Sequence, residues 1–248
     1  MVVLGICAAL LIGGSLGLFG GGGSILTVPT LHYLFGIETH AAITSSLLIV
    51  GVTSVVTLVP HLRAGRVRLR IGLVFGASSM VSAYAAGKLA SHVPSGVLLA
   101  AFALMMVVAS LAMLRPQRTP RARHAPGWLV VQGVVVGAIT GLVGAGGGFV
   151  IVPALVVLVG LPIIEAVATS LLIITLNSFA AFSATVMSVT LDGPVTGVVL
   201  AAAIVGAAIG GHVAPRISPA QLRRWFGWLI LSVAVVIAVA ELPALWAH

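Results

Sequence analysis

The stretch GLFGGGGSILTVP, from Gly17 to Pro29, places four successive glycines inside a strongly apolar sequence. Glycine destabilises a helix interior by about 1 kcal/mol relative to alanine, and an unpaired backbone group in lipid is more costly still. A chain that keeps such a stretch is expected to need uncovered backbone there. A second copy, GLVGAGGGFVIVP from Gly141 to Pro153, follows 124 positions later in a chain of 248 residues.

The composition indicates a membrane protein. The chain is 60% apolar and 6% charged, with a mean hydropathy of +1.26, whereas a soluble domain must cover its core with polar residues. Successive apolar stretches long enough to cross about 30 Å of hydrocarbon predict an all-α polytopic membrane protein. A β-barrel would instead show short alternating segments. The sequence opens apolar at Met1 without a charged region, which predicts that the first helix is retained rather than cleaved as a signal peptide.

Apolar runs and the breaks between them predict ten helical segments. They cover residues 2–18, 24–35, 39–60, 70–90 and 96–114 in the first half, and residues 128–143, 148–160, 163–187, 194–212 and 220–241 in the second half. Segments 24–35 and 148–160 are shorter than the roughly 20 residues that a membrane span needs. Each of these two short segments follows a glycine cluster.

The two halves align without gaps at an offset of 124 residues. Eight of the fifteen positions in 17–31 are identical to their counterparts in 141–155, and the register persists as far as Gly87 and Gly211. This pattern predicts an internal duplication, with a first transmembrane repeat at 1–114, a basic cytoplasmic linker at 115–127 and a second transmembrane repeat at 128–248.

The arginines predict how the chain lies in the membrane. They gather in three short loops, at 63–70, 115–123 and 216–224. If each short segment forms a re-entrant hairpin with the helix before it, all three loops fall on one side, which the positive-inside rule makes cytoplasmic. Both termini then lie outside and the second repeat is inverted. Two full crossings per pair would give the same sidedness, whereas a single broken crossing would place loop 216–224 outside.

An inverted repeat with broken helices near the midplane is a recurrent architecture of secondary transporters. Glycine leaves backbone N–H groups uncovered, and the helices that start near Ser24 and Gly148 would direct positive dipole ends to the same place. Such a site favours an anion. No cofactor or metal is expected, because Cys7 is the single cysteine and the histidines show no metal-ligand spacing. The sequence contains no recognisable pair of a nucleophile and a base, so it does not suggest an enzyme. The arginines are confined to short membrane loops, which argues against nucleic-acid binding.

The sequence also resembles a known family. The paired GxxGxGGGxxxxP-like motifs, each followed by a TS(S/L)L segment, are similar to those of the TauE/SafE sulfite exporter family, also called TSUP, over essentially the whole chain. The resemblance implies a multi-pass permease of the bacterial or archaeal plasma membrane that carries sulfite, sulfonates or related sulfur-containing anions. Its partners would be the small anion and the lipid bilayer. A permease for another small anion, an importer of sulfur compounds and a homo-oligomeric assembly are all compatible with the sequence.

The candidate substrate-binding residues are glycines of the two motifs and polar residues of the segments that follow them. The first group comprises Gly20, Gly22, Gly23, Ser24, Gly144, Gly146, Gly147 and Gly148; the second comprises Thr44, Ser45, Ser46, Thr169, Ser170 and Asn177. The hydroxyl groups could donate hydrogen bonds to an oxyanion. Alternatively, they bond preceding backbone carbonyls or join helices, and Asn177 makes an interhelical hydrogen bond.

The acidic residues bear on the direction of transport. Glu38, Glu165, Asp192 and Glu241 all fall at segment ends or in loops, whereas proton relays normally place carboxylates at depth. A bacterial interior is electrically negative, so an anion leaves without a coupling ion. The sequence therefore predicts export across the inner membrane, driven largely by the membrane potential.

Overall fold

The computed structural model describes residues 2–21, 23–90, 95–115, 126–143 and 148–246, and within these ranges the chain is helical and contains no strand. The α-helices are α1 (Val2–Phe19), α2 (Ser24–Pro29), α3 (Thr39–Arg63), α4 (Leu69–Ala90), α5 (Ser95–Leu114), α6 (Pro126–Val143), α7 (Gly148–Val157), α8 (Ile163–Thr185), α9 (Gly193–Val213) and α10 (Pro219–Trp246). Short π- or 3₁₀-helical turns extend α2, α8 and α9. The ten predicted segments are confirmed.

Several helices differ from the prediction at their carboxyl ends: α7 ends at Val157, short of residue 160, α10 continues past residue 241 to Trp246, and two helices differ near a proline. The segment expected at 24–35 changes after Pro29 into a π-helix, Thr30–Leu34. Helix α3 continues through Pro60, where the prediction ended it, to Arg63. Proline removes one N–H donor, but the helix end here is closed by a Schellman motif. In that motif Gly65 takes a φ of +65°, its N–H donates to the Leu62 carbonyl, and the Arg66 N–H donates to the His61 carbonyl.

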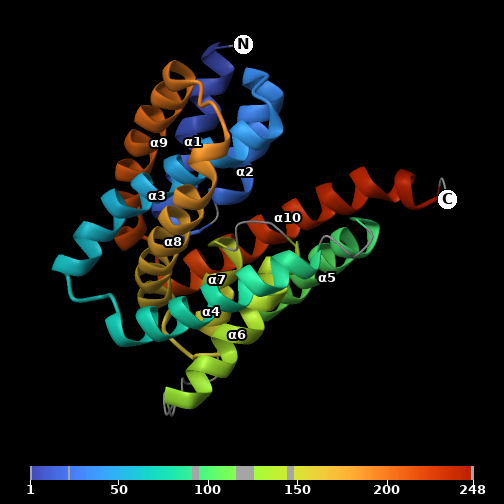
Figure 1. The fold of residues 1–248 in the computed structure, drawn as a ribbon. Helices are drawn as coiled ribbons and strands as arrows, with labels where there is room; N and C mark the ends of the chain where they lie inside the picture. The colour runs from blue at the N-terminus through green and yellow to red at the C-terminus, as the bar shows by residue number, and fades with distance from the viewer. Residues whose placement is uncertain (1, 22, 91–94, 116–125, 144–147, 247–248) are drawn as a thin grey trace.

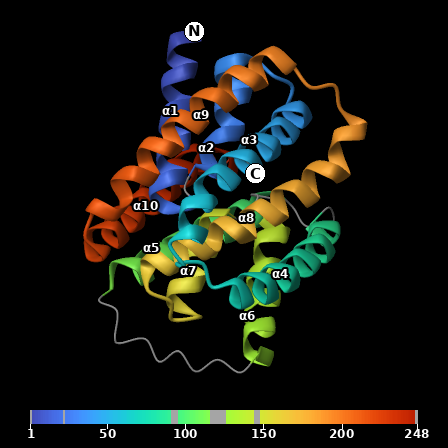
Figure 2. The ribbon, with the colours of Figure 1, turned by 90° about the vertical axis from the view of Figure 1, so that its left-hand side faces the viewer.

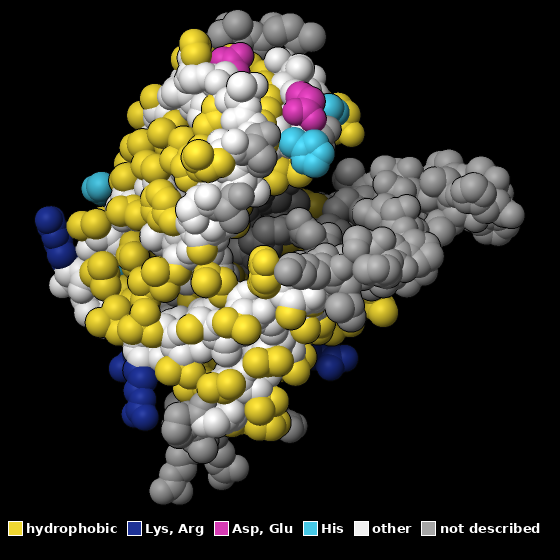
Figure 3. All heavy atoms as spheres, in the orientation of Figure 1, with side chains coloured by type: hydrophobic (Ala, Val, Ile, Leu, Met, Phe, Trp, Pro, Cys, Tyr) yellow, Lys and Arg dark blue, Asp and Glu magenta, His cyan; other side chains and the backbone are white. Residues whose placement is uncertain are grey.

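The surface and helix lengths are those of a multi-pass membrane protein. Among the described residues, four stretches are long and apolar enough to cross a bilayer: His40–Arg63, Leu69–Ala86, Ile163–Ser183 and Gly193–Val213. Large apolar side chains are exposed on these and other helices, including Leu11 and Val81, which are 70% and 69% exposed. Apolar side chains cover much of the face shown in Figure 3. In a soluble protein such extensive apolar surface would be unusual.

Helices of the first half pack against helices of the second half in matching pairs. Helix α1 packs along α9, and α6, its counterpart in the second half, packs along α4, the counterpart of α9. Helices α3 and α8 pack against each other, as do α5 and α10. Figures 1 and 2 show α1, α2, α3 and α9 gathered at one end of the molecule and α4, α6 and α7 at the other. The fourth helix of each half therefore packs against the first helix of the other half.

Glycines at matching positions permit both cross-half pairings. A Cβ on Gly13 of α1 would overlap the carbonyl oxygen of Ala203 on α9, and a Cβ on Gly137 of α6 would overlap that of Ser79 on α4. Gly137 lies 124 residues after Gly13, and Ser79 lies 124 residues before Ala203. Close backbone approach through small residues is how transmembrane helices associate without a hydrophobic driving force between them. The duplication seen in the sequence thus recurs as a repeated contact.

The carboxylates of Glu38 and Asp192 are helix caps that lie away from the arginines visible in Figure 3. Glu38 caps α3 by accepting from the His40 N–H at 3.4 Å, and Asp192 caps α9 by accepting from the Val195 N–H at 3.0 Å. In Figure 3 the visible carboxylates lie at the upper end and the visible arginines lie lower down. The two acidic caps and the arginines visible in this view thus lie toward different ends of the molecule.

Candidate functional site

The glycine break of the first half touches the start of the broken segment in the second half. Helix α1 ends at Phe19, and Gly20 then takes a φ of +70°, a conformation that side chains disfavour. A Cβ on the next residue, Gly21, would overlap the carbonyl oxygen of Gly148, the first residue of α7. The backbone of the first glycine loop is therefore in direct contact with the amino end of α7.

Ser170 joins α8 to the first glycine loop. Its hydroxyl is fully buried and lies 3.0 Å from the carbonyl oxygen of Gly20 and 2.8 Å from that of Val167, so it donates to this pair of acceptors. A Cβ on Gly20 would lie only 2.7 Å from the Val167 oxygen and 2.8 Å from the Ser170 oxygen. The absence of a side chain at Gly20 thus lets α8 of the second half approach the loop of the first half.

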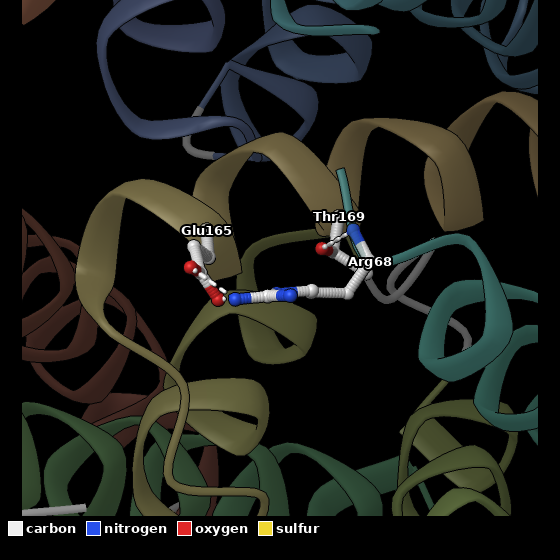
Figure 4. Close-up of polar contacts among 3 residues, drawn as sticks. All are labelled: Arg68, Glu165 and Thr169. Atoms are coloured by element: carbon white, nitrogen blue, oxygen red, sulfur yellow. Dashed lines mark hydrogen bonds and ion pairs between the residues drawn. The ribbon is translucent and has the colours of Figure 1, made fainter. Parts of the chain in front are cut away.

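An ion pair and a hydrogen bond hold the α3–α4 loop against α8 (Figure 4). The Arg68 guanidinium donates to both carboxylate oxygens of Glu165 at 2.7 Å, and the Arg68 backbone N–H donates to the Thr169 hydroxyl oxygen at 3.1 Å. The hydrogen bond to Glu165, and then the charge of that carboxylate, raise the pKa of Arg68 above its ordinary value. Arg68 thus stays cationic, and its charge is balanced by a carboxylate of the other half.

The candidate hydroxyls on α3 have partners of their own. Thr44 donates to the His40 carbonyl at 3.0 Å and Ser46 donates to the Ile43 carbonyl at 2.7 Å, both within α3. Ser45 accepts a hydrogen bond from Thr196 of α9 at 3.1 Å. These contacts are the backbone-bonding and helix-joining roles that the sequence left open for such residues. All three side chains are buried.

Buried polar atoms recur at matching positions on α3 and α8. The hydroxyl oxygens of Thr53 and Ser54 and the side-chain oxygen of Asn177 are buried without a hydrogen-bond partner. Asn177 lies 124 residues after Thr53, and Ser178, the counterpart of Ser54, is also buried. A Cβ on Gly51 would lie 3.4 Å from Ser178, so the two helices meet at this level. Since an unsatisfied buried group costs about 1–3 kcal/mol, this repeated set can serve a polar molecule that passes between the helices.

The remaining candidate residues are placed as follows. Gly23 lies between the first loop and α2, and a Cβ there would overlap the Ile12 carbonyl oxygen of α1. Ser24 begins α2. Gly22, Gly144, Gly146 and Gly147 lie outside the described residues. The contact between Gly21 and Gly148 and the ion pair between Arg68 and Glu165 were not predicted. The available signals were the glycine breaks that hold the two glycines, and the positions of Arg68 just before α4 and of Glu165 in the first turn of α8.

Comparisons with known proteins identify the class to which this site belongs. The family model described as sulfite exporter TauE/SafE matches residues 5–237. The chain is 33% identical over 243 residues to a probable membrane transporter protein of Xylella fastidiosa, covering 92% of this chain and 91% of the relative. It is 30% identical over 251 residues to the probable membrane transporter protein YunE of Bacillus subtilis, covering 88% and 87%. No solved structure matches the chain.

The fold and the broken helices are those of a membrane transporter, and the matches agree with that class. The chain belongs to the TauE/SafE sulfite exporter family. The resemblance noted in the sequence is thereby confirmed.

Proposed function

We propose that this protein exports small sulfur-containing anions, such as sulfite or organosulfonates, across a bacterial plasma membrane. The contact between Gly21 and Gly148 is the observation that carries the proposal, because it joins the broken segments of both halves at one place. Membership of the TauE/SafE family supports the sulfur-containing class of substrate.

The anion binds between the two glycine loops, where the absence of side chains lets it approach the backbone closely. Gly20 and Gly21 on one side and the amino end of α7 at Gly148 on the other are the closest described backbone, and the Gly20 N–H itself donates to the Leu16 carbonyl at 2.8 Å. The positive dipole end of α7 adds to the attraction. The buried oxygen-bearing side chains Thr53 and Asn177 continue the polar lining between α3 and α8. Irregular backbone of this kind is tolerated at membrane depth where it is buried or lines a path.

The two repeats are inverted relative to each other, with re-entrant hairpins, the arginine loops in the cytoplasm and both termini outside. The exchange of α9 and α4 between the halves supports a two-fold relation. We expect single cysteines at Arg224 and Asp192, in a Cys7→Ala background, to react with an impermeant thiol reagent from opposite sides of the membrane. Labelling is measured in right-side-out and inverted vesicles. Reaction of both positions from the same side would contradict this orientation.

Flux into proteoliposomes tests the function itself. We expect counterflow of labelled sulfite and of a small sulfonate well above that of empty liposomes, with chloride as the matched control anion. A potential of 100 mV is worth about 2.3 kcal/mol for one charge, or about a 50-fold concentration ratio. An imposed potential of 100 mV should therefore change the steady-state concentration ratio of the anion across the membrane about 50-fold in the direction of export.

The alternative is an importer of sulfur compounds or a permease for another small anion. An importer must couple the anion to a driving ion, because the potential opposes entry. Accumulation of the anion on the negative side, sustained by an imposed proton gradient, would favour this alternative over the exporter. Flux no faster than empty liposomes across a broad anion panel would contradict transport of small anions altogether.

A further inference from the structure

A cavity of about 100 Å³ lies beside the first glycine loop, at the end of α3 that carries arginines. It is lined by Leu18, His61, Arg66, Ile164, Val167, Ala214 and Leu222. A single buried water needs about 10–15 Å³ of such space, so the cavity has room for several waters or for one small polyatomic anion. Its wall includes Val167, whose carbonyl oxygen accepts from Ser170 next to Gly20. The cavity therefore adjoins the glycine loop.

The polar side chains of this cavity are a histidine and an arginine. His61 is 6% exposed, and its Nδ1 is buried without a hydrogen-bond partner. The Schellman motif at the end of α3 turns the chain back at Gly65, which brings Arg66 over the same turn, with its N–H 3.1 Å from the His61 carbonyl oxygen. The other lining side chains, from α1, α8, α10 and the turn after α9, are apolar. The neighbouring carboxylate, Glu165, is engaged by Arg68.

This combination suits an oxyanion. A buried imidazole nitrogen without a partner is costly, and a tautomer with hydrogen on Nδ1 can donate to an oxygen. A guanidinium presents a planar fork to oxyanions. The rest of the lining is apolar, which leaves these two groups as the polar attachment points.

We propose that the His61–Arg66 cavity is a recognition site where the oxyanion docks before it reaches the glycine loops. This inference rests on the proposed transport of small anions and adds a first binding step at the face that carries the arginine loops. Arg66 supplies the charge at the mouth, and His61 supplies a donor at depth. The bound anion then lies next to Leu18 and Val167, which border the loop at Gly20.

The test compares Arg66→Gln and His61→Leu with Arg63→Gln in the full-length chain in proteoliposomes at low ionic strength. Arg63 ends the same helix, is exposed and does not line the cavity. With labelled sulfite applied to the arginine-loop face, Arg66→Gln and His61→Leu should each raise the half-saturating concentration about tenfold, as expected for loss of a hydrogen bond to a charged group. The maximal rate should change less than about twofold. Arg63→Gln should leave both quantities unchanged, and His61→Gln, which keeps an N–H donor, should restore part of the affinity.

A second measurement tests this site independently of whether sulfite is the transported substrate. Thermal stabilisation of the purified chain is followed with sulfite, methanesulfonate, sulfate and phosphate as probes. Stabilisation by an oxyanion that is lost in Arg66→Gln and kept in Arg63→Gln supports the site even if sulfite is not transported. Stabilisation by none of the probes, or half-saturating concentrations within twofold of the parent for both cavity variants, would overturn it.

Discussion

Replacing Gly21 by valine should reduce anion flux to the level of empty liposomes while leaving most of the chain folded. The valine side chain would collide with the Gly148 carbonyl, which is backbone at the first turn of α7 and cannot rotate away. The two loops would have to separate, and the donors of one half would no longer face the anion held by the other. The helices that anchor the fold, α1 with α9 and α4 with α6, do not depend on this contact.

A matched substitution distinguishes loss of the site from loss of the fold. Gly197 lies in α9, and a Cβ there would have no neighbour within 4 Å. Gly197→Val should keep the parent flux, with stability unchanged or slightly raised because valine has the better helix propensity. Flux and thermal stability are measured for both variants. A well-folded Gly21→Val protein that transports at the parent rate would remove this contact from the mechanism. The same substitution at Gly22 or Gly146 is expected from the sequence to abolish transport in the same way.

Replacing Gly13 by alanine should destabilise the protein by about 3 kcal/mol, an effect at the upper end of those seen on overpacking. The new methyl group would overlap the Ala203 carbonyl of α9, so α1 and α9 would have to move apart along much of their contact. For a chain of this size the change corresponds to a loss of about 6–12 °C in Tm. The measurement is thermal unfolding of the purified chain in lipid nanodiscs, together with folded yield.

The adjacent glycine provides the control. A Cβ on Gly14 would lie 3.7 Å from the Gly206 carbonyl oxygen, an ordinary contact, so Gly14→Ala should be neutral or slightly stabilising. Gly137→Ala should match Gly13→Ala in size, because Gly137 meets the Ser79 carbonyl in the equivalent way. Equal stabilities for the Gly13 and Gly14 variants would show that close backbone approach does not hold these helices together.

The sequence predicts the helices well, because each is an apolar run ended by glycine, proline or arginine. It does not predict the extension of α3 past Pro60 or the π-helical turn after Pro29, because both depend on how local hydrogen bonds close a helix end. Nor does it predict that α1 pairs with α9. Apolar periodicity shows which residues are buried when water is the solvent, but it loses this information in a bilayer, where lipid-facing residues are equally apolar.

The candidate site is only partly predictable for a related reason. The duplicated glycine motifs indicate two breaks that face a common substrate, and Gly21 does lie against Gly148. The partners of the hydroxyls depend instead on which helix of the other half is adjacent, as for Ser170 with Gly20 and Ser45 with Thr196. Polar residue type gives no indication of such partners. The sequence argues only against a metal-binding role for the histidines and does not predict His61 as an anion-binding residue, because its environment comes from four other elements.

The packing of helices across the two halves determines the order in which helix pairs can form during synthesis. Helix α1 is complete at Phe19, but its partner α9 begins at Gly193, about 170 residues later along the chain. At synthesis rates of roughly 5–20 residues per second, the glycine face of α1 waits on the order of 10–35 s in the bilayer for its counterpart. Helix α6 emerges when α4 is already in place and can pair at once. The α4–α6 pair can therefore form first, and the α1–α9 pair forms only after most of the carboxyl-terminal half has been synthesised.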